Sequence, residues 1–115
     1  TLCELAAVTP FSPADGVSQA PVCAGRQKDV REECCIEYRT GYGRTGQDAK
    51  VVVTKNWKYA IYHNGDEELT DLKNDPRESR NCIAEHPHTA REMKDRLLLH
   101  LIGSESRMPR QVSHA

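Results

Sequence analysis

The stretch that decides the fold runs from Lys50 to Pro76 and reads KVVVTKNWKYAIYHNGDEELTDLKNDP. The β-branched run within 50–54 predicts a strand, because branched side chains pack well on a pleated surface. Lys55-Asn56 is short enough for a tight link to a second predicted strand, 57–63. Alternation along that second strand predicts two faces, one with Trp57, Tyr59 and Ile61 and the other with Lys58, Ala60 and Tyr62.

Turn residues bound the remaining strands. Asn64-Gly65 predicts a hairpin turn of type I′, which needs positive φ at both residues. A strand over 68–72 returns, and Pro76 ends it because proline has no N–H to donate to a ladder. Upstream, 34–38 predicts another strand, joined to 50–54 by the glycine-rich loop 39–47. Together these segments predict a four-stranded antiparallel sheet.

The clearest predicted helix covers 87–102 and ends at Gly103. Its apolar stripe has helical spacing and consists of Ala90, Met93, Leu97 and Leu101. We expect this stripe to pack on one face of the sheet, because a sheet of this size needs such a cover to be stable. The sequence therefore predicts an α+β fold with one C-terminal helix.

Two segments precede the sheet. Apolar residues at helical spacing in 1–8 predict a short helix remnant, which Pro10 prevents from continuing. Proline and glycine in 9–27 predict an irregular connection. We expect three parts: 1–27 as the end of a larger domain with its connecting segment, 28–103 as a C-terminal subdomain, and 104–115 as a disordered tail. Because the chain starts at Thr1 without an initiator Met, we expect it to belong to a longer polypeptide.

Composition narrows the classes of partner. The 16 Lys and Arg residues nearly balance the 17 Asp and Glu residues, so we expect no nucleic-acid partner. No apolar stretch approaches the ~20 residues that span a bilayer, so we expect no membrane partner. Five cysteines form an odd set without scaffold-like spacing, and we interpret them as reduced, small apolar residues.

The order of these elements resembles the end of the type I sulfatases, arylsulfatase-like members of the alkaline phosphatase superfamily. The most specific block is Glu68–Asn81, which is similar to the family pattern ELxDLxNDPxExxN. Further blocks match in order, and they are Thr1–Val8, Asp15–Ser18 with Pro21–Gly25, Glu37–Arg39, and Lys50–Tyr62. The resemblance covers about residues 1–102.

This resemblance implies a full-length parent that hydrolyses sulfuric esters with a formylglycine nucleophile and a calcium ion. The nucleophile comes from a Cys-x-Pro-x-Arg motif, which this chain lacks: in Cys35–Arg39, Glu37 stands where proline is required. We therefore expect no catalytic residue and no cofactor in this chain. Cys82, His86 and His88 have spacing that could suit zinc, but they lack a fourth ligand of comparable quality, so we expect no metal site.

One loop carries groups suited to substrate contact. Arg39, Tyr42 and Arg44 lie among glycines, and guanidinium forks match sulfate and carboxylate oxygens. In a full-length parent this loop could read the part of the substrate that does not react. The simpler interpretation, an exposed loop without a binding role, stays open at this point.

Two classes of function remain. The leading hypothesis is a structural subdomain of a sulfatase, inactive alone, partnered by the large catalytic domain of the same polypeptide. Its exposed apolar surface could then drive self-association. The alternatives are an independent small α+β binding module and the same region of a phosphonate or phosphate ester hydrolase. The substrate stays open, as does the compartment of the parent, whether periplasmic, secreted or lysosomal.

Overall fold

A computed structural model describes residues 1–10, 16–39 and 48–105, and the chain divides into two compact units, Thr1–Glu32 and Glu33–Ala115. The first unit contains two short helices, α1 (Leu2–Leu5) and α2 (Ala20–Cys23). The predicted N-terminal helix is therefore present but only four residues long. The expectation of an irregular connection over 9–27 was wrong at 20–23, where α2 forms with a proline in its first turn. A missing N–H does no harm at that position.

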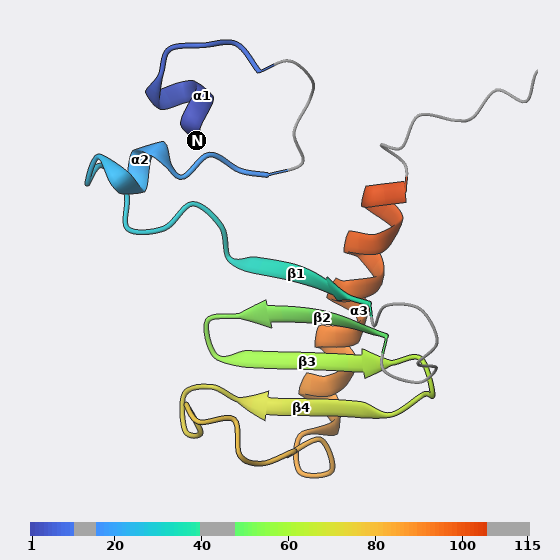
Figure 1. The fold of residues 1–115 in the computed structure, drawn as a ribbon. Coiled ribbons are helices and arrows are strands. Elements are labelled where there is room, and N and C mark those ends of the chain that lie inside the picture. Colours follow the sequence, from blue (N-terminus) through green and yellow to red (C-terminus); the bar gives the residue numbers. More distant parts are fainter. Residues whose placement is uncertain (11–15, 40–47, 106–115) are drawn as a thin grey trace, which may run out of the picture. The chain divides into compact units, whose positions relative to one another are not determined.

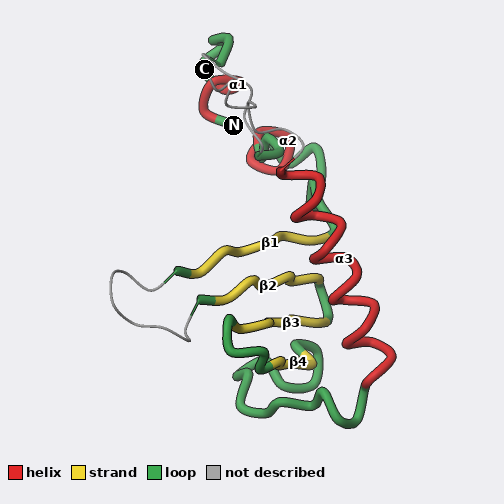
Figure 2. Tube along the Cα trace, turned by 90° about the vertical axis from the view of Figure 1, so that its right-hand side faces the viewer, coloured by secondary structure: helices red, strands yellow, loops and turns green. Residues whose placement is uncertain are grey.

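The second unit contains a four-stranded antiparallel sheet with strand order β1-β2-β3-β4 (Figure 1). Its strands are β1 (Glu33–Tyr38), β2 (Ala49–Thr54), β3 (Trp57–Tyr62) and β4 (Glu67–Asp71). The helix α3 (Pro87–Glu105) follows. Figure 2 shows α3 on one side of the sheet, crossing the strands. The predicted α+β fold is confirmed.

The main core lies between α3 and the sheet. Val52, Tyr59 and Leu69 are fully buried there, one from each of β2, β3 and β4. The helix contributes the predicted stripe: Ala90, Met93 and Leu97 are buried and Leu101 is partly buried. Ala60 and Tyr62 pack instead with residues of β2 in a second, smaller cluster. The two predicted faces of β3 are thus confirmed.

Two predicted features were wrong: the residue at which the last helix ends and the type of the β3–β4 turn. Helix α3 continues through Gly103 to Glu105, because a single glycine weakens a helix without ending it. The β3–β4 turn is not type I′, since Gly65 has φ +92° but Asn64 does not have positive φ. The Gly65 N–H donates to the Tyr62 carbonyl and the Tyr62 N–H to the Asp66 carbonyl, both at 2.9 Å. This is a three-residue hairpin loop that needs left-handed geometry only at its glycine.

The segment after β4 closes the outer edge of that strand. The Asn81 side-chain oxygen accepts from the Leu69 N–H at 3.0 Å, and its amide donates to the Glu67 carbonyl at 3.1 Å. The Cys82 N–H then donates to the Leu69 carbonyl at 2.8 Å. Asp71 organises the preceding turn by accepting two backbone N–H groups. The polar residues of the segment after β4 therefore have structural roles.

Candidate functional site

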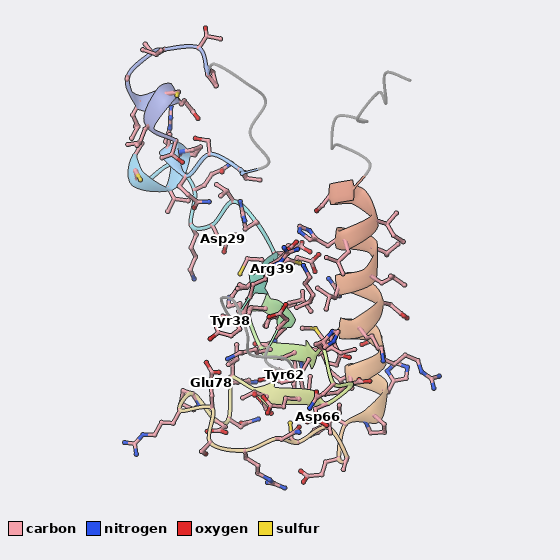
Figure 3. All side chains as sticks on the ribbon, turned by 45° about the vertical axis from the view of Figure 1, so that its right-hand side comes forward. Asp29, Tyr38, Arg39, Tyr62, Asp66 and Glu78 are labelled. Carbon is pink, nitrogen blue, oxygen red and sulfur yellow. The ribbon has the colours of Figure 1, made fainter. Side chains whose placement is uncertain are left out.

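Polar side chains gather where β1 ends, β2 begins and β3 ends. The register pairs Glu37 with Lys50, and the His63 N–H donates to the Asp48 carbonyl at 2.8 Å. Side chains two residues apart point to the same face of a strand. The polar groups at these strand ends therefore lie on the face of the sheet that α3 covers farther along the strands. We call this set the polar shelf, and it consists of Glu37, Arg39, Asp48, Lys50 and His63. Figure 3 shows Arg39 and Tyr38 at the end of β1.

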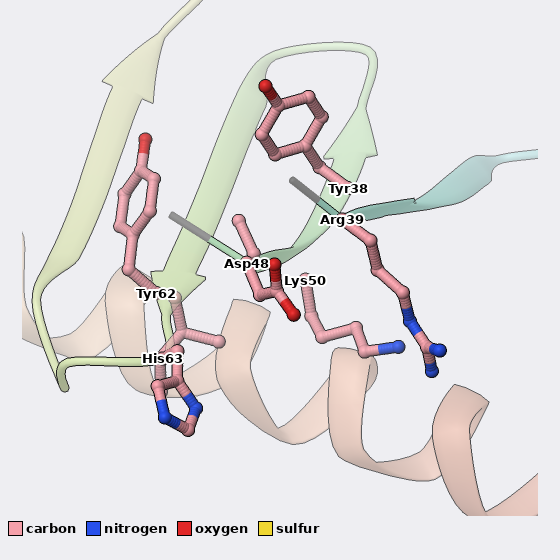
Figure 4. A pocket seen from close by; sticks show the side chains of 8 residues that line it. Tyr38, Arg39, Asp48, Lys50, Tyr62 and His63 are labelled. Atoms are coloured by element: carbon pink, nitrogen blue, oxygen red, sulfur yellow. The ribbon is translucent and has the colours of Figure 1, made fainter. Parts of the chain in front are cut away.

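A pocket of about 340 Å³ opens at the polar shelf (Figure 4). The lining residues come from the ends of three strands and are Tyr38, Arg39, Asp48, Ala49, Lys50, Ile61, Tyr62 and His63. In Figure 4 the side chains of Arg39, Lys50 and His63 extend to the side on which α3 lies, and the two tyrosines extend to the opposite side. Three nitrogen-bearing side chains thus line this pocket.

The charges of the polar shelf are coupled. Lys50 forms an ion pair with Glu37 across β1 and β2. The hydrogen bond from Lys50 and its charge lower the pKa of Glu37, and the charges of Arg39 and His100 lower it further. Glu37 is therefore ionised at neutral pH and holds the Lys50 ammonium in place. Arg39 forms no ion pair within the described part of the chain.

The structure places one of the three predicted substrate-contacting residues. Arg39 lines the pocket, whereas Tyr42 and Arg44 lie outside the described residues. Sequence reasoning missed Lys50 and His63 as companions of Arg39. The alternation of β2 and β3 carries the signal for their common face, but only the strand register brings them beside Arg39.

The sequence motif Cys35–Arg39 offers no nucleophile. Cys35 lies within β1 and packs against the main core. Burial raises the pKa of its thiol to about 11, with the charge of Glu33 as a smaller cause. A thiol in that state is protonated at neutral pH and reacts slowly.

The described residues do not fit a resident metal ion. Within 1–10, 16–39 and 48–105, no group of three or more His, Cys, Asp or Glu side chains could hold one. Cys82 is buried with its sulfur 3.2 Å from the Leu69 carbonyl, and His86 packs against Trp57 with ring centroids 5.1 Å apart. His88 instead neighbours Glu92 on the surface of α3. All five cysteines are free, and no described helix is long and apolar enough to cross a membrane.

Comparisons with known proteins give the chain a family context. No protein-family profile matches the chain. It is 31% identical over 101 residues to a Δ4,5-hexuronate-2-O-sulfatase of Bacteroides thetaiotaomicron, a match that covers 86% of this chain and 21% of that protein. A solved 2-O GAG sulfatase is similar with a TM-score of 0.72 and 28% identity, over 93% of this chain and 24% of that one.

A third protein shares the fold alone. This structure, of a protein in complex with its substrate D-glucosamine-2-N,6-O-disulfate, gives a TM-score of 0.78 at 22% identity, over 97% of this chain and 24% of that one. The chain thus spans between a fifth and a quarter of the length of the relatives that it matches. Matched blocks, strand order and these similarities together identify the chain as a C-terminal sulfatase-like region.

Proposed function

We propose that this chain is the terminal subdomain of a sulfuric ester hydrolase and that it is inactive alone. The observation that carries the proposal is the similarity to a curated 2-O-sulfatase over 86% of this chain and only 21% of that enzyme. A piece of that size can complete a fold without containing the chemistry. The sequence also lacks the Cys-x-Pro-x-Arg motif from which a formylglycine would be made.

The partner that fits this role is the large catalytic domain of the same polypeptide. That domain would supply the formylglycine nucleophile and the calcium ion of the parent. Residues 28–103 would form the subdomain, with 1–27 as the connection to it. Exposed apolar side chains in the sheet unit suit a contact with such a domain: Ile36, Tyr38, Leu98, Leu99 and Ile102 are about half exposed or more. The same groups would drive self-association of the isolated chain.

Arg39, with Tyr42 and Arg44, is proposed to contribute to the substrate cleft of the parent. The relatives are named as sulfatases of uronic acids and of glycosaminoglycans. Substrates of that class carry acidic groups beside the ester that is cleaved. A guanidinium at the pocket mouth can bind such a group without taking part in the reaction.

The proposal is tested by determining the complete coding sequence that contains this chain and by assaying the complete protein. A Cys- or Ser-x-Pro-x-Arg motif upstream is expected, together with sulfate release from an unsaturated 2-O-sulfated uronate disaccharide by the complete protein. The 115-residue chain should release none at the same concentration. Faster hydrolysis of a phosphate monoester than of any sulfate ester would refute the sulfatase assignment, and sulfate release by the chain alone would refute its inactivity.

A further inference from the structure

We propose that the polar shelf is a binding site for a singly charged oxyanion, a sulfate ester or a carboxylate, with Arg39 as the main contact and Lys50 and His63 beside it. This inference rests on the proposed function and deepens it. The polar shelf would bind an acidic group of the substrate that is not cleaved. It also provides two contact residues, Lys50 and His63, that the loop containing Arg39 does not include.

The fold brings the three nitrogen-bearing side chains together. Arg39 follows β1, Lys50 belongs to β2 and His63 follows β3, so each is anchored to a different strand of one sheet. All three line the same 340 Å³ pocket. The backbone bond from the His63 N–H to the Asp48 carbonyl ties β3 to β2 at this point.

Donor capacity favours an oxyanion as the ligand. A guanidinium carries five N–H donors in a planar fork, and Arg39 uses none of them in an ion pair among the described residues. The Lys50 ammonium has three donors and gives one to Glu37, which fixes its position. Its side chain is 32% exposed, so the remaining donors are reachable from the pocket.

The carboxylates of the polar shelf limit the negative charge that a ligand can carry there. Among the described residues of the polar shelf, the two carboxylates of Glu37 and Asp48 equal in number the cations of Lys50 and Arg39, before His63 is considered. A group of one negative charge meets little repulsion there. A phosphate monoester, which carries about −1.5 to −2 at neutral pH, meets more. Because the site is shallow and exposed, we expect a dissociation constant on the order of 1 mM.

The experiment is chemical-shift mapping of the ¹⁵N-labelled chain at constant ionic strength. Sodium methyl sulfate, sodium glucuronate and sodium methyl phosphate are titrated separately, with sodium chloride as the reference salt. Saturable shifts confined to the ends of β1, β2 and β3 are expected with methyl sulfate, glucuronate or both. Which of the two binds identifies the source of the oxyanion. Methyl phosphate should bind more weakly.

Matched variants decide whether Arg39 is responsible. Arg39→Gln should weaken binding at least tenfold, Lys50→Gln should weaken it less, and Arg77→Gln, an exposed control outside the pocket, should leave it unchanged. The spectra themselves report whether each variant is folded. Equal shifts in the parent chain and Arg39→Gln, or no saturation with either oxyanion, overturn the inference. Sulfate release by the complete protein is measured separately, so the proposed function can survive that result.

Discussion

Replacing Asn81 with alanine tests whether the polar segment after β4 stabilises the fold. Asn81 makes three bonds: it accepts from the Leu69 N–H at 3.0 Å and the Ile83 N–H at 3.1 Å, and donates to the Glu67 carbonyl at 3.1 Å. Leu69 is fully buried, so its N–H has poor access to water if its acceptor is removed. We expect Asn81→Ala to unfold more easily for that reason.

The expected loss follows from the burial of each bond. A buried donor left without a partner costs about 1–3 kcal/mol, and that applies to the Leu69 N–H. The other two bonds are exposed, and water replaces them at a loss of about 0.5 kcal/mol each. The total is about 2–4 kcal/mol. With a urea m-value of about 1–2 kcal/mol/M, the unfolding midpoint should fall by about 1–4 M.

Urea titration followed by circular dichroism measures this change, and the m-value should stay constant. The matched control is Asn81→Asp, whose carboxylate still accepts from Leu69 and Ile83 but cannot donate to Glu67. It should lose clearly less stability than the alanine variant. A loss below about 0.5 kcal/mol for Asn81→Ala, or an equal loss for both variants, would refute the edge-closing role.

Three further outcomes are expected. Hydrogen bonds from Lys94 and Tyr59, both at 2.6 Å, lower the pKa of Glu67 from its ordinary 4.5. The resulting stabilisation is complete above that ordinary value and is lost as the pH falls through the lowered pKa, so urea midpoints measured from pH 7 into the acid range should drop less in Lys94→Met. Leu97→Ala should lose about 2–4 kcal/mol, since Leu97 is 3% exposed in the main core, and Leu99→Ala, 70% exposed, should lose almost none in the same assay. At pH 8, iodoacetamide should modify exposed Cys23 at least about tenfold faster than Cys35, whose pKa is raised to about 11; mass spectrometry of the peptides with equal rates at both sites would contradict this.

The strands were predictable because each one carries a period-two or β-branched pattern. Tyr59 and Ala60 fall on the two faces that alternation assigns them, whereas alternation alone did not say which of these faces α3 covers. The misplaced features depend on weaker local preferences. Asn64-Gly65 fits two hairpin loops of different length, and the hydrogen bonds at Tyr62 select the longer one. The extension of α3 through Gly103 has the same origin, since one glycine disfavours a helix by only about 1 kcal/mol.

The candidate site was predictable only in part. Arg39 was found from its chemistry, because a guanidinium next to glycines stands out in a sequence. Lys50 and His63 are 11 and 24 positions further along (50 − 39 and 63 − 39), and no local pattern joins them to Arg39. Their meeting depends on pairing across three strands, which is a tertiary property. The hydrogen bonds between Asn81 and β4 are likewise tertiary contacts that no local sequence pattern predicts.

The two edges of the sheet differ in what they offer to another molecule. Asn81 and Cys82 occupy backbone groups on the outer side of β4, whereas β1 pairs only with β2 among the described strands. A sheet that can be extended on both sides can form an open-ended filament, but one that can be extended on a single side stops after one addition. Among the described strands, the edge of β1 is therefore the side on which this sheet could be extended, and an addition there would place two β1 strands at the centre of a pair.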